Sequence, residues 1–215
     1  MKKIRTIICV IGSSLLIMCL VLIGIHSLQK EEWEGLDVIN VACSKRLCNS
    51  LSEVEGEATI IVEVEVGEVL DQKVSSFYDA TFQKELPSAG YTRRELIIEK
   101  VYQGEKSIGD KIVLLHDYFI WENTDNTKQL ISLSGYKPMK KGDKYLLFLA
   151  WDESKDGYYV IGDYQGIYPV EETVVSKKGT SNTVKQDFAH VYSNEEYSFT
   201  LVPIYEEVRE KYFEN

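Results

Sequence analysis

The sequence feature that most constrains the fold is a pair of short apolar runs joined by a tight-turn signal. Tyr145 to Trp151 is a continuous apolar run, too short for a typical helix and rich in aromatic residues, which predicts a buried strand. Asp156-Gly157 is a strong hairpin signal, and Tyr158 to Ile161 predicts the returning strand. Since an isolated hairpin is only marginally stable in water, this one requires further strands.

Other parts of the chain supply those strands. In Ala58 to Leu70 the apolar residues alternate with acids, so this segment is predicted to be a strand with one buried face. Strands are also predicted at Tyr91–Tyr102, Lys111–His116 and Gln165–Val175. The intervening segments Asp71–Gly90 and Asp117–Gly135 are polar and irregular, and we expect them to be long surface loops.

Two short helices are expected beside the strands. The first falls within Val41–Val54. Pro203 suits the first position of the second, where its missing N–H costs nothing, and Tyr205, Val208 and Tyr212 then share one face. The predicted class is therefore mainly β: a small antiparallel barrel like the oligonucleotide/oligosaccharide-binding (OB) fold, with one or two short helices and a preceding transmembrane helix.

The N-terminus has the pattern of a membrane segment. Met1–Arg5 is basic, and Thr6–Ile25 is almost wholly apolar and, at about 20 residues, long enough to cross a bilayer. Cations before this segment and acids after it predict a cytoplasmic N-terminus. An uncleaved signal anchor is our first interpretation, and the alternatives are a signal peptide cleaved after Ser27 and a lipoprotein attached at Cys19. The anchor places Gln29–Asn215 outside the cytoplasm at the cell membrane, and cleavage would make that part secreted.

We divide the chain into five parts on this basis. They are a cytoplasmic basic head (1–5), a transmembrane signal anchor or signal peptide (6–27), a spacer with a short helix (28–53), a β-barrel domain (54–175), and a loop with a C-terminal helix packed on the barrel (176–215).

The charge of the chain argues against some partners. The net charge is −10, and because the first 29 residues carry three cations and no acids, the remainder has a charge of −13. Nucleic acids and anionic lipid surfaces both favour Lys and Arg, so neither is an expected partner of this part. The same acidity is also ordinary for the solubility of an exposed domain.

Several strand and turn segments together resemble known modules. These segments are Ala58–Gly67, Val101–Gly104, Ile108–Asp110 and Lys141–Leu149. Over about Val54–Val170 their succession resembles small extracytoplasmic β-barrel domains of bacteria and, more distantly, the inhibitory domain of tissue inhibitors of metalloproteinases and netrin-type modules. The resemblance implies a small OB-like barrel. Those inhibitors chelate the protease zinc through an N-terminal Cys-x-Cys. Cys43 and Cys48 depart from this pattern, because four residues lie between them.

Cys43 and Cys48 are the one chemical feature of the segment Val41–Val54. Outside the cytoplasm a local disulfide between them is favoured, and we predict that bond. Free, partly buried thiols are the alternative. A redox role would favour C-x-x-C, and a zinc site would need two further ligands.

No other pattern predicts a catalytic residue, a cofactor or a metal ligand. The oxygen-bearing residues between Asp152 and Asp163 nearly trace a calcium loop, but their flanks are predicted strands, so a hairpin turn is expected. His116 and His190 have the chemistry of a base, but nothing in the sequence places a nucleophile beside either.

Aromatic residues gather on the central hairpin and just after it. They are Trp151, Tyr158, Tyr159, Tyr164 and Tyr168. One interpretation is cross-strand packing, and the other is a binding face for a protein, peptide or glycan.

We therefore expect a non-enzymatic, membrane-anchored extracytoplasmic module that binds a protein or cell-envelope ligand. The alternatives are an envelope hydrolase or thiol redox protein using Cys43, Cys48 or His116, and an inhibitor of an extracellular protease.

Overall fold

The computed structural model describes residues 30–43, 46–170 and 204–214. The chain divides into two compact units, Met1–Glu34 and Gly35–Asn215. Within the described ranges no helix is long and apolar enough to cross a membrane. The expected membrane segment and its alternative processing sites lie outside those ranges.

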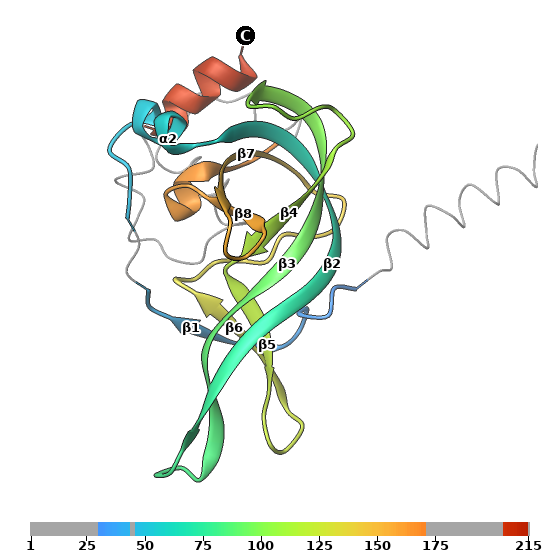
Figure 1. The fold of residues 1–215 in the computed structure, drawn as a ribbon, viewed down its shortest axis with the longest axis vertical. Helices are drawn as coiled ribbons and strands as arrows, with labels where there is room; N and C mark the ends of the chain where they lie inside the picture. The colour runs from blue at the N-terminus through green and yellow to red at the C-terminus, as the bar shows by residue number, and fades with distance from the viewer. Residues whose placement is uncertain (1–29, 44–45, 171–203, 215) are drawn as a thin grey trace, which may run out of the picture. The chain divides into compact units, whose positions relative to one another are not determined.

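The second unit is mainly β, as predicted, and its strands form two sheets (Figure 1). The larger sheet pairs in the order β2-β3-β4-β8-β7-β9, and β7 also pairs with β2. The strands are β2 (Ile60–Asp79), β3 (Lys84–Gln103), β4 (Lys111–His116), β7 (Lys144–Asp152), β8 (Gly157–Val160) and β9 (Ile167–Pro169). The parallel contact of β4 with β8 is the single pair Leu114↔Tyr158, so this sheet is ring-like without being a barrel.

The smaller sheet has the order β1-β6-β5. Its strands are β1 (Asp37–Val41), β5 (Tyr118–Glu122) and β6 (Lys128–Leu133). β6 runs antiparallel to β5 and parallel to β1. The expectation of a loop over Asp117–Gly135 was therefore wrong, because most of that segment is the β5–β6 hairpin.

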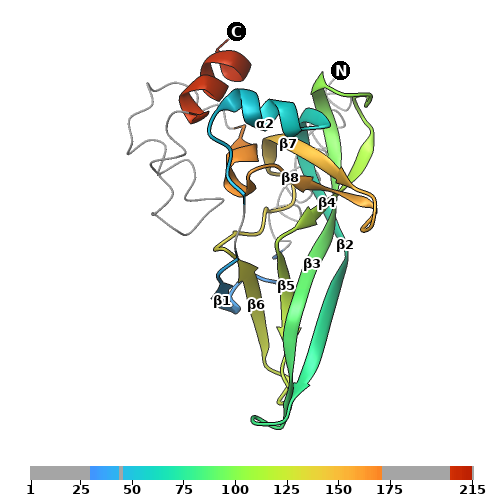
Figure 2. The same cartoon turned by 60° about the vertical axis from the view of Figure 1, so that its left-hand side comes forward.

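The most prominent departure from the expected fold is the length of the β2–β3 hairpin (Figures 1 and 2). Its ladder continues to the pair Asp79↔Lys84, so Asp71–Gly90, expected to be a loop, consists mainly of strand. Only the proximal half belongs to the ring-like sheet: β2 pairs with β7 over Ile60–Glu65, and β3 pairs with β4 over Thr92–Ile97. We call the distal part, residues 73–89, the arm.

Gly67 marks the point where β2 separates from β7. The register of β2 against β3 shifts between Val66 and Val69, as it does at a bulge. A side chain at Gly67 would begin 2.9 Å from the carbonyl oxygen of Glu95 on β3, so glycine permits the close approach of the two strands there.

Two helices cover one side of the core. Helix α2 (Leu51–Glu57) begins at Leu51 and not near Val41, because the side chain of Ser50 caps it by accepting from the Glu53 N–H. A second helix covers 204–213, and its second half, Arg209–Phe213, is π-helical. Its buried face consists of Ile204, Tyr205, Val208 and Tyr212, which confirms the predicted apolar face, whereas Pro203 lies outside the described ranges.

The C-terminal helix docks through Tyr212. The hydroxyl of Tyr212 donates to Glu55 Oε1 of α2 at 2.7 Å. Its aromatic ring packs edge-on against Tyr102 and Phe148, with ring centroids 4.8 Å and 5.5 Å away. Lys211 adds an ion pair to Glu55 at 2.8 Å.

Candidate functional site

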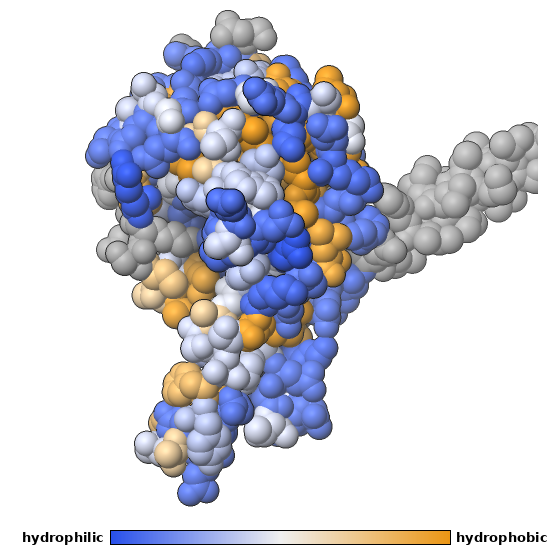
Figure 3. All heavy atoms as spheres, viewed as in Figure 1, coloured by the Kyte–Doolittle hydropathy of each residue, from blue (hydrophilic) through white to orange (hydrophobic). Residues whose placement is uncertain are grey.

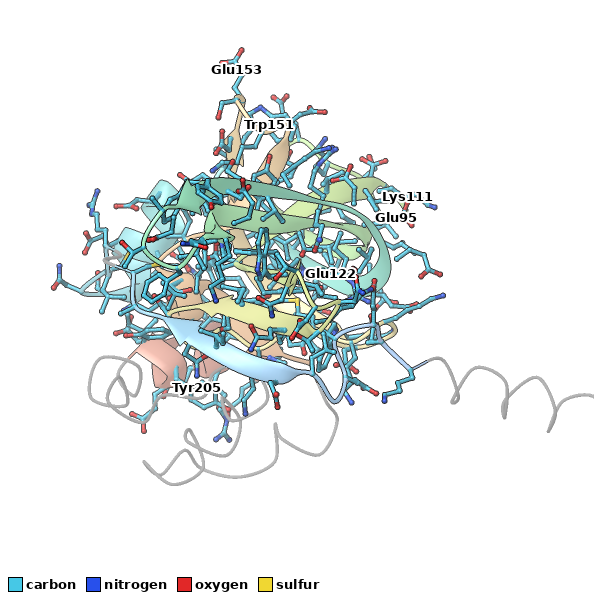
Figure 4. All side chains as sticks on the ribbon, turned by 90° about the horizontal axis from the view of Figure 1, so that it is seen from below. Glu95, Lys111, Glu122, Trp151, Glu153 and Tyr205 are labelled. Atoms are coloured by element: carbon cyan, nitrogen blue, oxygen red, sulfur yellow. The ribbon has the colours of Figure 1, made fainter. Side chains whose placement is uncertain are left out.

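The five aromatic residues predicted as a binding face do not form one surface. Tyr158, Tyr164 and Tyr168 are buried, at 7%, 1% and 1% exposed, and therefore belong to the core. Trp151 and Tyr159 are 45% and 43% exposed. In the β7–β8 register Trp151 lies opposite Tyr158 and Tyr159 lies opposite Ala150, so the two exposed side chains occupy opposite faces of the hairpin. Figure 4 shows Trp151 near Glu153 on this outlying hairpin.

The arm carries three exposed aromatic residues, two of which, Phe77 and Tyr78, point to opposite faces of the hairpin. Phe77, Tyr78 and Phe82 are 49%, 60% and 66% exposed, and lie at or beside the turn that joins β2 to β3. The projecting part of the surface in Figure 3 accordingly carries hydrophobic residues among hydrophilic ones. We call these three residues the tip cluster. These residues were not predicted as a binding surface because Asp71–Gly90 was expected to be a loop. The signal available in the sequence was the presence of three aromatic residues in a short polar stretch.

The turn that presents the tip cluster is fixed by its own hydrogen bonds. Asp79 Oδ1 accepts from the backbone N–H of Thr81 at 2.8 Å and of Phe82 at 3.1 Å. Gln83 has a φ of 54°, a left-handed conformation that lets the chain reverse before Lys84. The aromatic side chains are thus held on an ordered turn, which reduces the entropy that binding would cost.

The base of the arm is attached to the β5–β6 hairpin. The side chain of Gln72 accepts from the Ile120 N–H at 2.9 Å and donates to the Ile120 carbonyl at 3.0 Å. Phe119 packs so closely that a Cβ on Gly90 would lie 2.6 Å from it. These contacts set the direction of the arm.

The β5–β6 hairpin extends alongside the arm (Figures 1 and 2). The pKa of Asp125 is lowered, mainly by hydrogen bonds from Thr127 and also by the charge of Lys84 on β3. Along the arm itself, neither β2 nor β3 pairs with a further strand in the described part of the chain. This end of the domain therefore combines exposed aromatic side chains with two open strand edges.

The two candidate cysteines are held in different places. Ser134 Oγ accepts from the Cys43 N–H at 3.3 Å and donates to the Cys43 carbonyl at 3.2 Å. The side chain of Gln165 makes the corresponding pair of bonds to Cys48, at 2.7 Å and 2.8 Å. In the structure both cysteines are free thiols, Cys43 exposed and Cys48 buried, so the predicted disulfide is not formed in it and stays a prediction for oxidising conditions.

Cys48 lies near two carboxylates that already have a cationic partner. One ligand atom each of Cys48, Glu53 and Glu57 lie within 4.8 Å of one another. Arg46 pairs with Glu53 at 3.1 Å and with Glu57 at 2.6 Å. Burial, and then the nearby carboxylates, raise the pKa of the Cys48 thiol, which disfavours the thiolate that a nucleophile or metal ligand requires. The arrangement serves as an ion-pair network.

His116 lies in a buried polar cluster. It is 1% exposed, and its Nδ1 is 3.0 Å from the hydroxyl of Tyr136. Arg94, also 1% exposed, donates to the carbonyls of Gly67 at 3.0 Å and Met139 at 2.6 Å. Burial, with a smaller contribution from the charge of Arg94, lowers the pKa of His116 well below its usual range, so the imidazole is neutral.

The segment that nearly traces a calcium loop forms the β7–β8 turn, as expected. Asp152 Oδ1 accepts from the Ser154 hydroxyl at 2.6 Å and from its N–H at 3.0 Å, while Oδ2 pairs with Lys155 at 2.9 Å. Hydrogen bonds from Ser154 and Lys155 lower the pKa of Asp152 to about 2. The Asp152 carboxylate is engaged in stabilising the turn.

No protein-family model, curated protein or solved structure matches the chain.

Proposed function

We propose that this chain is a non-enzymatic binding module, anchored in the cell membrane by its N-terminal segment, and that it captures a protein partner with the arm. The observation that carries this proposal is the tip cluster: three aromatic side chains at least 49% exposed, on an ordered turn. Exposed aromatic residues are costly to leave in water and are the residue type that anchors protein interfaces.

The chemistry of the arm favours a protein over other ligands. Its charged residues are Lys73, Asp79, Lys84 and Glu85, which balance in sign. A nucleic acid or an anionic surface would need an excess of cations. A partner with an apolar patch and an extended segment would match both the aromatic side chains and the open edges, since extended segments bind by adding a strand to an existing sheet.

The placement of the candidate catalytic groups supports a binding role over a hydrolase or redox enzyme. His116 is 1% exposed and Cys48 is 4% exposed, so a substrate could not reach either side chain in this conformation. Cys43 is exposed, but it has no described acid, base or thiol bonded to its side chain. An extracellular protease inhibitor remains an alternative supported only by the resemblance of the sequence.

The anchor, the extracytoplasmic location and a relation of the ring-like sheet to the OB fold are parts of the same proposal. The first two rest on the apolar segment Thr6–Ile25 and its flanking charges. The third is supported by the cyclic order of the larger sheet, in which β7 returns to β2. Proteins with an OB fold bind ligands on their strands and loops.

Site-specific photo-crosslinking of the full-length protein in its native membranes would test the arm. A crosslinking amino acid at Phe82 is expected to capture one defined protein, and the same residue at Ile108 is the matched control. Ile108 is 73% exposed and follows the opposite end of β3. Substitutions Phe77→Ser and Tyr78→Ser should abolish the adduct at Phe82.

Three outcomes would contradict the proposal or redirect it. Equal adducts at Phe82 and Ile108 would show non-specific contact. Adducts with lipid alone would assign the tip cluster to the membrane surface. If the adduct at Phe82 is lost on Trp151→Ala or Tyr159→Ala but retained on Phe77→Ser and Tyr78→Ser, the binding surface lies on the β7–β8 hairpin instead.

A further inference from the structure

Strand β1 lies at the edge of the smaller sheet with nothing on its outer side in the described part of the chain. It pairs only with β6, and all five of its residues are exposed. Three of them are apolar: Val38, Ile39 and Val41 are 54%, 41% and 41% exposed. Natural edge strands are usually protected by a lysine, a proline, a bulge or a covering segment. β1 has none of the first three, and its one charge, Asp37, is at its first position.

The hydrogen-bonding direction of β1 follows from one bond. The carbonyl of Val41 accepts from the Ser134 N–H at 2.7 Å, so the backbone groups of Val41 point toward β6. Backbone direction alternates along a strand, so those of Ile39 also point toward β6. The N–H and carbonyl groups of Val38 and Asn40 therefore point outward.

We infer that β1 pairs with β1 of a second copy of this chain, antiparallel and centred on Ile39. In this register Val38 of each copy lies opposite Asn40 of the other, and each of these two pairs exchanges two hydrogen bonds. Ile39 lies directly opposite its counterpart at the two-fold axis. The two three-stranded sheets then form one continuous sheet.

The sequence of β1 favours a second copy over an unrelated strand. The pattern Asp-Val-Ile-Asn-Val is compatible with itself under two-fold symmetry, because Asp37 then faces Val41 and no like charges are opposed. A two-fold interface uses the same patch on both copies, which is the commonest form of homo-oligomer. This inference is independent of the arm and goes beyond the proposed function.

Cysteine scanning of the full-length protein in membranes would test the pairing. In a background with Cys9, Cys19, Cys43 and Cys48 replaced by alanine, Ile39→Cys should form a disulfide-linked dimer of twice 24.6 kDa on mild oxidation. Directly opposed residues at a non-hydrogen-bonded position lie about 4.5 Å apart between Cα atoms. Val38→Cys should give little dimer, because its counterpart is displaced by two residues along the strand.

A proline substitution tests the hydrogen bonds without disturbing β6. Asn40→Pro removes an outward N–H and leaves the groups facing β6 intact, which an edge strand tolerates. It should abolish the dimer formed by Ile39→Cys, whereas Asn40→Ala should preserve it. The absence of dimer at Ile39, an equal yield at Val38, or persistence of the dimer in Asn40→Pro would each overturn the inference. If Ile39→Cys forms no dimer and reacts slowly with a bulky maleimide, another segment covers β1, and this result would also overturn the inference.

Discussion

Gln165 provides the sharpest test of how the segment before α2 is fixed. Its side chain is fully buried and makes two hydrogen bonds to the backbone of Cys48. Its Nε2 donates to the Cys48 carbonyl at 2.8 Å, and its Oε1 accepts from the Cys48 N–H at 2.7 Å. The substitution Gln165→Met keeps the length of the side chain and removes both polar groups. The N–H and carbonyl of Cys48 would then remain buried without partners.

The expected cost follows from those two groups. A buried backbone group that loses its partner costs about 1–3 kcal/mol. With partial relaxation of residues 46–48, we expect Gln165→Met to lower the free energy of unfolding by about 2–5 kcal/mol. Gln103 is the matched control, since it makes one such bond, to the Ala58 carbonyl at 2.8 Å, and is exposed. Gln103→Met should cost about 1 kcal/mol or less.

Pulse proteolysis in urea on the full-length protein in membranes would measure both variants. Labelling of Cys48 under native conditions adds a local readout, because release of this segment should expose the thiol. A loss smaller than about 1 kcal/mol in Gln165→Met, with Cys48 still protected, would refute the role assigned to Gln165.

Three further predictions address stability. Burial lowers the pKa of His116, so below about pH 6.5 the unfolded chain binds a proton at this residue that the folded chain does not. The free energy of unfolding should therefore fall with decreasing pH, by at most about 1.4 kcal/mol per pH unit, and His116→Gln should remove this slope in urea titrations. Tyr212→Phe removes the 2.7 Å bond to Glu55 and should cost about 1–2 kcal/mol, measured by pulse proteolysis, and no change would show that the bond contributes nothing. Phe82→Ser on the exposed tip should alter stability by less than about 0.5 kcal/mol, and a larger loss by the same assay would indicate that this residue packs in the core.

The parts of the fold that the sequence predicts are those with one buried face. Val62, Val64 and Val66 are buried while Glu63 and Glu65 between them are partly exposed, and the β7–β8 hairpin lies where it was predicted. The C-terminal helix likewise buries the predicted face. In each case one side of the element is buried away from water, so apolar residues recur along the sequence with the period of a strand or a helix.

The candidate site was less predictable because exposure depends on distant contacts. Tyr158 and Tyr159 are neighbours in sequence, yet one is 7% and the other 43% exposed. Tyr168 is buried because Phe148 and Tyr205 pack against it, and Tyr205 comes from the end of the chain. Local sequence gives the aromatic residues but not the partners that cover them.

The arm shows why the most exposed feature of the domain was the hardest to predict. An alternating pattern arises only where one face of a strand meets a core, and the two strands of the arm have solvent on both faces. Phe77 and Tyr78 are therefore both exposed although they point to opposite sides of the hairpin. A strand pair with no core of its own is only marginally stable, so the arm depends on its continuation into β2 and β3 and on the attachment of Gln72 to Ile120. Exposed aromatic side chains on such a structure contribute little to folding, and this supports the binding role that we propose for the arm.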